Sequence, residues 1–256
     1  MNLSGHTILI TGGTAGIGLA FAKKFLELGN EVIVTGRRQS KLDEVKAANP
    51  KLHCIQSDVA RSADIKALAV RVKAEFPKLD VLMNNAGVMV WKNLRSPAAD
   101  LDALVEEMDI NVSGTIRMVS VFIDILTANK GTIINVSSGL AFVPLPAAPI
   151  YCATKAAIHS YCTSLRFQLE DSGVRVVELM PPAVKTELAD IPEGDGFTVI
   201  TTDVLVEATL KGLKADKTEI RPGQSNQLYW MQAIAPAFIN GQLWKGSKSM
   251  LPKAEG

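Results

Sequence analysis

The stretch His6-Thr7-Ile8-Leu9-Ile10-Thr11-Gly12-Gly13-Thr14-Ala15-Gly16-Ile17-Gly18 decides the fold of this chain. Its first half is largely apolar and β-rich, which predicts a buried strand, and its second half is a glycine-rich turn that opens a helix. Such glycines allow the backbone to approach a pyrophosphate closely, and the helix N-terminus supplies N–H groups and the positive end of a dipole. A glycine-rich turn is often only a turn. Its place between the first strand and the first helix favours a dinucleotide site.

Short β-rich runs alternate with helical patterns along the rest of the chain. Most of the runs are continuously apolar, as parallel strands covered on both faces are. The predicted strands span 6–11, 31–35, 53–57, 81–84, 132–137 and 174–180, and the predicted helices span 16–28, 39–48, 62–76, 97–127 and 151–172. This order predicts an α/β fold: a Rossmann-type, doubly wound parallel sheet with helices on both faces. No linker-like tract divides the chain, so we expect residues 1–256 to form one domain.

Composition narrows the class of protein. The chain has 256 residues, is 47% hydrophobic and carries a formal net charge of +1. A charge this small argues against a nucleic-acid surface or a polybasic membrane patch. No apolar run approaches the roughly 18 residues of a membrane span, and the N-terminus does not resemble a secretion signal. The three cysteines, Cys54, Cys152 and Cys162, fit neither a disulfide framework nor a zinc site. We therefore expect a cytoplasmic protein without a bound metal.

The end of the second predicted strand indicates which dinucleotide binds. NAD-binding units usually place an acidic residue here for the ribose hydroxyls, whereas a basic residue accommodates the 2′-phosphate of NADP. This chain has Gly36 followed by Arg37 and Arg38. A solvated basic helix start is the alternative, but positive charge at a helix N-terminus opposes the dipole. The pattern favours NADP(H) over NAD(H).

Tyr151 and Lys155 are four residues apart and would share one face of a helix. A phenol titrates near pH 10, and a neighbouring ammonium group favours its ionised form. Such a pair can move a proton onto or off an oxygen near neutral pH. The same spacing occurs by chance in many proteins, so the pair needs support from the rest of the chain.

Together these motifs resemble the short-chain dehydrogenase/reductase family, in its branch with a YxxxK active site. The match runs from Thr11 to about Thr186. It comprises the glycine motif at 11–18, Asp58-Val59 after the third strand, Asn84-Asn85-Ala86-Gly87, Asn111, Ser138 thirteen residues before Tyr151, and Lys155. A subgroup that includes the reductase-like protein of the D-alanyl lipoteichoic acid operon is also similar, but this likeness indicates no substrate.

The resemblance implies the role of each matched residue. Tyr151 would donate a proton to a carbonyl oxygen, and Lys155 would lower the pKa of Tyr151 and bind the nicotinamide ribose. Ser138 would hydrogen-bond the substrate oxygen, and Asn111 would hold a water in a proton relay. The implied cofactor-binding residues are Gly12, Thr14, Gly16, Ile17, Gly18, Arg37, Arg38, Asp58, Val59, Asn85, Ala86, Gly87, Tyr151, Lys155, Val184 and Thr186.

One departure from the family pattern follows the sixth strand. The family usually has PGxVxT there, whereas this chain has Pro181-Pro182-Ala183-Val184-Lys185-Thr186. Proline fixes φ and lacks an N–H, so we expect an altered loop. Val184 and Thr186 match the family positions that bind the carboxamide, and nicotinamide binding should persist.

An apolar substrate site is expected around these residues, beneath a lid formed by 187–201. Gly194 and Gly196 would allow the lid to move. The pocket candidates are Val88, Met89, Leu140, Phe142, Leu145 and Phe197, with Trp230 and Met231 closing the far side.

Other reactive residue types are expected to be structural. Cys152 adjoins Tyr151, but its neighbours suggest helix packing rather than a nucleophile. His159 shows no partner for a metal or triad role. The carboxylates of Glu106, Glu107 and Asp109 fit an exposed helix face.

The leading hypothesis is an NADPH-dependent carbonyl reductase, acting in reverse as an alcohol dehydrogenase on a small carbonyl or alcohol. A catalytically silent NADP(H) sensor or scaffold is the alternative, and an epimerase or dehydratase is a third possibility. Family members commonly pair through the helices predicted at 97–127 and 151–172, so we expect a homodimer or homotetramer.

Overall fold

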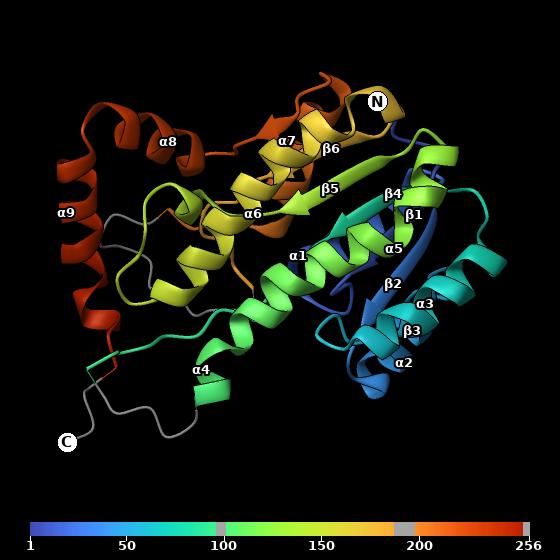
Figure 1. The fold of residues 1–256 in the computed structure, drawn as a ribbon, viewed down its shortest axis with the longest axis horizontal. Helices are drawn as coiled ribbons and strands as arrows, with labels where there is room; N and C mark the ends of the chain where they lie inside the picture. The colour runs from blue at the N-terminus through green and yellow to red at the C-terminus, as the bar shows by residue number, and fades with distance from the viewer. Residues whose placement is uncertain (96–100, 187–197, 253–256) are drawn as a thin grey trace.

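A computed structural model describes residues 1–95, 101–186 and 198–252. Seven parallel strands form a single sheet in the order β3-β2-β1-β4-β5-β6-β7 (Figure 1). The predicted α/β, doubly wound sheet is confirmed. The strands are β1 (Thr7–Thr11), β2 (Glu31–Gly36), β3 (His53–Gln56), β4 (Leu79–Asn84), β5 (Thr132–Val136), β6 (Arg175–Leu179) and β7 (Glu219–Ile220).

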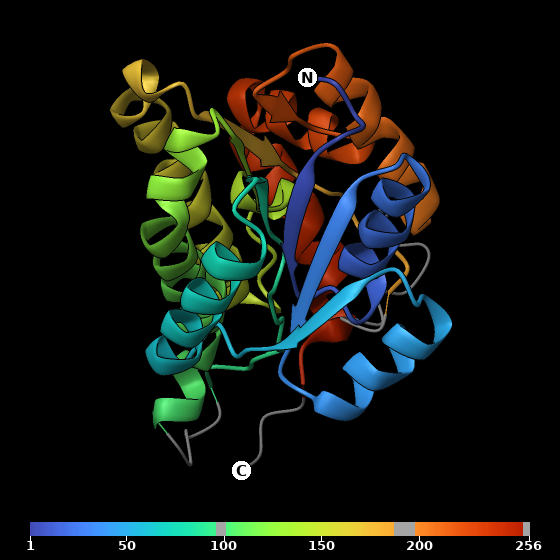
Figure 2. The ribbon, with the colours of Figure 1, turned by 90° about the vertical axis from the view of Figure 1, so that its right-hand side faces the viewer.

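Helices cover both faces of the sheet, which Figure 2 shows nearly edge-on. One apolar cluster joins the sheet to α1 (Gly16–Glu27), α2 (Gln39–Ala48) and α7 (Thr202–Lys214). A second cluster joins the other face to α3 (Ser62–Glu75), α5 (Gly114–Ala128) and α6 (Pro149–Gln168). Two core layers on opposite faces explain why the central strands are apolar without alternation.

The long helix expected at 97–127 is present in the described residues, with a π-helical turn inside it. It consists of α4 (Leu101–Met108), a π-helical turn (Asp109–Ser113) and α5. Residues 96–100 lie outside the described part of the chain. π-Helical turns inside α-helices are frequent at functional sites, and this turn contains Asn111.

Four elements follow the last predicted helix and were not expected: β7, α7, α8 (Gln224–Ile234) and α9 (Pro236–Ser247). Thr201 caps α7 by accepting a hydrogen bond from the Val204 N–H at 3.3 Å. α8 and α9 pack on one another and extend beyond the end of the sheet (Figure 1).

The strand order places the site. The chain crosses from β3 past β2 and β1 to β4, so the connections diverge between β1 and β4. In open α/β sheets, ligands bind at the carboxyl ends of the strands at such a switch point.

Within the part of the chain that the structure describes, one helix, Asp102–Ala128, is long and apolar enough to cross a membrane. Its Met118, Val119, Phe122 and Leu126 side chains are buried against the sheet in the second apolar cluster. This packing is that of a core helix of the α/β fold.

Candidate active site

The glycine turn between β1 and α1 packs closely against the residues that follow β4. Gly12 has a φ of +65°, and a Cβ there would lie 2.9 Å from the Cα of Ala86. Gly16 has a φ of +52° and opens α1, whose N-cap residue Ala15 makes no side-chain capping bond. The first turn of α1 therefore presents backbone N–H groups that no capping side chain covers, as an anion site requires.

Gly18 has a different role from the other glycines of this motif. A Cβ at Gly18 would lie 2.4 Å from the Gly12 carbonyl oxygen and 2.5 Å from the Asn85 side chain. The residue lets α1 pack tightly on the turn, and it does not line the cavity.

The end of β2 has no room for an acidic side chain at Gly36 unless Thr14 moves. A Cβ at Gly36 would lie 2.8 Å from the Thr14 methyl group, so a larger residue there would displace Thr14. Arg38 follows and lines the cavity, whereas Arg37 is exposed, with Nη1 3.9 Å from the Glu106 carboxylate. Arg38 is therefore the arginine that lies at the expected cofactor site.

Asp58 and Val59 lie after β3 and are not among the cavity-lining residues. The Asp58 carboxylate accepts a hydrogen bond from the Ala60 N–H at 3.0 Å. Val59 is buried against Gly114 of α5, where a Cβ would be only 3.0 Å away. The adenine contacts expected of this pair remain a prediction.

Asn85 ties the end of β4 to the glycine turn. Its Nδ2 donates to the carbonyl oxygens of Thr11 and Gly12 at 3.0 and 3.2 Å, and its own N–H donates to the Thr11 hydroxyl. Ala86 and Gly87 follow along the cavity. This network holds β1 and β4 in register at the point where the cofactor is expected.

Lys155 is almost fully buried and lines the cavity from α6. Its Nζ donates to the carbonyl oxygen of Val136 at 2.9 Å and lies 5.5 Å from the centre of the Tyr151 ring. Burial lowers the pKa of Lys155 to about 8, while the negative charge of Glu178 opposes this shift.

The surroundings of Tyr151 favour its neutral form. Burial raises its pKa above the usual range of a phenol, although a hydrogen bond with Ser138 acts in the other direction. Desolvation of the phenolate therefore outweighs that hydrogen bond, and the expected lowering of this pKa by Lys155 stays a prediction. The phenol therefore stays protonated at neutral pH, which is the form that can donate a proton.

Ser138 follows β5 with an extended backbone and caps a short 3₁₀ turn (Gly139–Ala141). Its Oγ accepts a hydrogen bond from the Leu140 N–H at 3.1 Å. The buried hydroxyl faces the cavity together with the Tyr151 phenol. Two hydroxyl groups thus converge where one substrate oxygen could accept both.

Asn111 does not line the cavity. Its Nδ2 donates to the Val88 carbonyl and to the Thr154 hydroxyl at 2.9 and 3.0 Å, and its Oδ1 accepts from the Val88 N–H at 2.9 Å. The side chain thus locks the segment after β4 to α6. Its expected part in a water relay stays a prediction.

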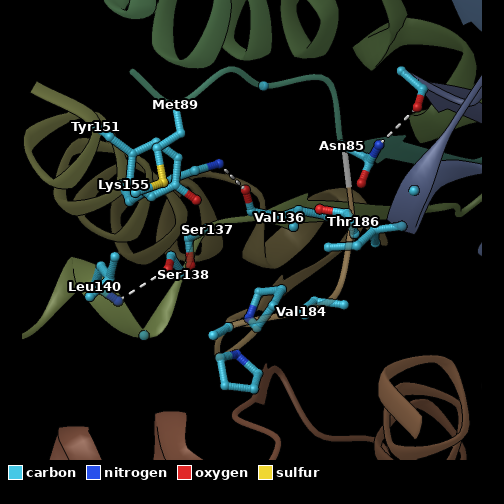
Figure 3. Close-up of a pocket in the computed structure, with 18 of the residues that line it drawn as sticks. Asn85, Met89, Val136, Ser137, Ser138, Leu140, Tyr151, Lys155, Val184 and Thr186 are labelled. Carbon is cyan, nitrogen blue, oxygen red and sulfur yellow. Dashed lines mark hydrogen bonds between the residues drawn. The ribbon is translucent and has the colours of Figure 1, made fainter. Parts of the chain in front are cut away.

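A cavity of about 320 Å³ connects the two halves of the site. Figure 3 shows Tyr151, Lys155, Ser138 and Met89 gathered at one end, and Asn85 and Thr186 at the other. The predicted residues that line it are Gly12, Thr14, Gly16, Ile17, Arg38, Asn85, Ala86, Gly87, Met89, Ser138, Leu140, Leu145, Tyr151, Lys155, Val184 and Thr186.

Several expected pocket residues point elsewhere. Val88 is partly buried and packs against the apolar cluster of α3, α5 and α6, whereas Met89 lines the cavity as expected. Phe142 packs edge-on against His159 and Tyr229, and Met231 joins that same cluster. Trp230 is 55% exposed and does not close the far side of the pocket, as was expected of it.

The lid expected at 187–201 falls largely outside the described residues, as does Phe197. Its last residues are anchored rather than free, because Ile200 forms a parallel bridge with Val184. Ile200 exchanges backbone hydrogen bonds with Ala183 and Lys185 at 3.0 and 2.9 Å.

The C-terminal helices α8 and α9 supply a wall of the cavity that the sequence did not predict. Gln224 and Leu228 of α8 and Leu243 of α9 line the cavity. The helix-start signals of Gly223 and Pro236 were available in the sequence, but no periodicity shows which face of such a helix meets a distant strand edge.

Pro182 is accommodated where the family usually has glycine. The carbonyl oxygen of Pro181 accepts a hydrogen bond from the Gly139 N–H at 3.0 Å, and Pro182 lines the cavity. Val184 and Thr186 also line it, and the Thr186 side chain approaches Gly16 at the start of α1. The proline thus leaves the expected nicotinamide wall in place.

Two residues expected to be unremarkable have buried polar contacts. Glu107 was expected on an exposed face, yet it is buried, accepts the Val90 N–H at 3.0 Å and has a pKa raised by burial. The loop after β4 folds over it, which helix periodicity alone does not predict. His159 does have a partner, because its Nδ1 lies 2.9 Å from Oε2 of Glu178 on β6.

The three cysteines are free, as expected. Cys152 is buried beside Leu145, and burial raises the pKa of its thiol to about 11. A thiol so rarely ionised is a poor nucleophile, which agrees with a packing role.

Comparison with known proteins supports the family that the sequence motifs indicate. The family model of short chain dehydrogenases matches residues 6–193. The uncharacterized oxidoreductase DltE of Bacillus subtilis is 40% identical over 224 residues, covering 86% of this chain and 89% of its own. The NADP-dependent 3-hydroxy acid dehydrogenase YdfG of Escherichia coli O6:H1 is 31% identical, with 91% of each chain covered.

A solved structure is also similar throughout. The short chain dehydrogenase from Burkholderia cenocepacia, crystallised in complex with NADP, superposes with a TM-score of 0.83 at 26% identity. The match covers 95% of this chain and 99% of that one. With the family model spanning well over half of its length, the chain belongs to the short chain dehydrogenase family of oxidoreductases.

Proposed function

We propose that the protein is an NADPH-dependent carbonyl reductase, acting in reverse as an alcohol dehydrogenase, on apolar ketones, aldehydes or secondary alcohols. One observation carries the proposal. Tyr151, Ser138 and Lys155 meet at one end of an apolar cavity whose other end is the glycine turn and Arg38.

The residues present fit a dinucleotide. A Cβ at Gly12 would meet the backbone of Ala86, so the turn can pack against the end of β4 at the cavity only because Gly12 has no side chain. The uncapped start of α1 would hold the pyrophosphate, and Arg38, with Arg37 beside it, would bind a 2′-phosphate. The Burkholderia relative is described in complex with NADP, which supports this choice of cofactor.

The bound cofactor would supply the hydride, and the protein's own residues would manage the proton. Ser138 and Tyr151 both donate hydrogen bonds to the substrate oxygen in this scheme. The Tyr151 phenol, kept neutral by burial, then transfers its proton to that oxygen. The Lys155 ammonium group, held by the Val136 carbonyl, stabilises the phenolate that remains.

An apolar substrate is favoured by the cavity walls. Met89, Leu140, Leu145, Leu228 and Leu243 surround the reacting end. Among the described residues that line the cavity, the basic side chains are Lys155 and Arg38, and both have tasks in the scheme above. Nothing basic among these lining residues is left to clamp a substrate carboxylate, as a 3-hydroxy acid would require.

We further propose a cytoplasmic homodimer or homotetramer that pairs through α4, α5 and α6. Large apolar side chains are exposed on these helices, with Val105 at 48%, Ile116 at 41% and Phe167 at 75%. Apolar side chains left exposed on these helices would be covered if the helices pair with a second copy. Sedimentation that gives only a 27.5 kDa species at micromolar concentration would exclude this assembly.

The test of function is a carbonyl series at fixed NADPH, from small to large alkyl and aryl ketones, with matched 3-keto acids and phosphorylated carbonyls. We expect kcat/KM to rise with apolar size until the cavity is filled. Highest efficiency with an anionic substrate would contradict the substrate class, and binding of NADPH without oxidation across the series would favour a silent sensor.

A further inference from the structure

Beneath the reacting end of the cavity lies a buried carboxylate that the scheme above does not use. Glu178 is the fourth residue of β6, and its side chain is fully buried. Its Oε1 accepts a hydrogen bond from the Ser137 hydroxyl at 2.5 Å, and its Oε2 lies 2.9 Å from Nδ1 of His159. A buried charge is retained at considerable cost unless it is paired and hydrogen-bonded, and both oxygens here are engaged.

The position of Glu178 connects it to the catalytic residues on two sides. Ser137 immediately precedes Ser138, and its N–H donates to the Leu179 carbonyl at 2.8 Å. On the other side, Lys155 bonds the carbonyl of Val136, the residue before Ser137. The carboxylate thus holds the strand end that carries both the catalytic serine and the lysine's acceptor.

We propose that Glu178 is a positioning residue of this active site, which anchors the Ser137–Ser138 strand end and supplies the counter-charge for the buried Lys155 ammonium group. This inference rests on the proposed function, since it assigns a role within that chemistry. Glu178 would touch neither substrate nor cofactor and would act through Ser137 and Lys155.

Charged and polar groups surround Glu178 from each neighbouring element, and Lys155 lies one helical turn before His159 on the same face of α6. The groups are Lys155, His159, Cys162 and Arg166 on α6, Asn135 on β5 and Ser137 after it, Glu219 on β7, and Arg221, which binds Glu219. Arg166 lies 3.7 Å from Glu178 and 3.2 Å from Glu219, and Arg221 lies 3.1 Å from Glu219.

A metal ion is the competing interpretation of this cluster. Ligand atoms of His159, Glu178 and Glu219 lie within 4.8 Å of one another. Arg166 and Arg221 lie 3.2 and 3.1 Å from the Glu219 carboxylate, however, so a divalent cation bound there would have two guanidinium groups as close neighbours. The arginines favour an internal counter-charge network.

Two roles can be separated by two variants. Glu178→Gln keeps the shape and the capacity to hydrogen-bond Ser137 but removes the charge. Ser137→Ala removes the anchoring hydrogen bond but keeps the charge. Glu219→Gln is the matched control, because it neutralises a carboxylate of the same cluster that makes no contact with Ser137.

The readout for the charge is independent of turnover. Acetic anhydride labels only the neutral form of a lysine, and Lys155 lines the cavity, so the pH dependence of its labelling by mass spectrometry reports its titration. We expect the midpoint to fall in Glu178→Gln, with labelling below pH 8 rising about tenfold for each pH unit of movement, and to stay unchanged in Glu219→Gln and Ser137→Ala. An unmoved midpoint in Glu178→Gln overturns the counter-charge role.

The readout for anchoring is kinetic. With NADPH and an apolar ketone, Ser137→Ala should lower kcat severalfold while KM for NADPH stays within twofold, and the alkaline limb of kcat should move to lower pH only in Glu178→Gln. Wild-type kcat in Ser137→Ala overturns the anchoring role, even if Glu178→Gln does not fold. A wild-type protein that binds NADPH without turnover contradicts the proposed function alone, because the labelling experiment still reports on Glu178.

Discussion

Reversing the charge of Arg38 should change the cofactor preference of the protein. Arg38 lines the cavity beside Gly36, where an acidic residue would displace Thr14. A hydrogen bond to a charged group contributes about 1.5–3 kcal/mol, and about 1.36 kcal/mol corresponds to a factor of ten. Arg38 is exposed, so solvent screening reduces the effect toward the lower end. We expect Arg38→Asp to weaken NADPH binding about tenfold and to leave NADH binding nearly unchanged.

The assay is fluorescence titration of both cofactors, followed by kcat/KM for each with one apolar ketone, at low and physiological salt. Arg37→Asp should have a smaller effect, because Arg37 faces Glu106. The matched control is Arg71→Asp on α3, an arginine of similar exposure that pairs with Glu75 at 2.9 Å. A ratio of NADPH to NADH efficiency that stays within twofold of wild type in Arg38→Asp would refute the phosphate assignment, as would a wild-type preference for NADH.

Three further outcomes follow from the described geometry. Gly12→Ala, which introduces strain at a φ of +65° and a contact 2.9 Å from the Ala86 backbone, should lower the free energy of unfolding by more than about 1 kcal/mol and abolish cofactor binding, as measured by denaturant titration and fluorescence. Leu228→Ala should enlarge the cavity and move the kcat/KM optimum of an alkyl ketone series to larger substrates. The control Val70→Ala, at a 73% exposed site on α3, should leave that optimum unchanged. The hydrogen bond to Glu178 raises the pKa of His159, so this pair should stabilise the fold fully below about pH 6.5 and progressively less as pH rises through the raised pKa; the melting temperature of His159→Gln should therefore depend less on pH over that window than that of wild type.

Much of the fold could be predicted because local signals and the fold agree. The apolar runs that became β1, β4 and β5 are buried apart from Asp80 in β4, and the glycine turn stands where the strand–helix junction requires positive φ. The spacing of Ser138, Tyr151 and Lys155 likewise predicted that these three side chains act together, and all three line one cavity.

The features that were missed depend on tertiary contacts. β7 has two residues, too few for any periodic pattern, and exists because β6 offers it an edge. The burial of Glu107 depends on a loop that folds back from β4, and the pairing of His159 depends on a strand that lies beside α6 only after folding. The raised pKa of Tyr151 has the same origin, because desolvation is a property of the packed site and not of the Tyr-Lys spacing.

The most direct test of the central claim is the rate of NADPH oxidation with an apolar ketone in wild type and in Tyr151→Phe. The variant keeps the ring that packs against Leu145 and Cys152 and removes only the hydroxyl, so folding and NADPH binding should persist. We expect steady turnover in wild type and a loss of about 10²- to 10⁴-fold in kcat in Tyr151→Phe, the range of general acid catalysis. Near-normal turnover in Tyr151→Phe, with cofactor binding intact, would contradict the assignment of Tyr151 as the proton donor.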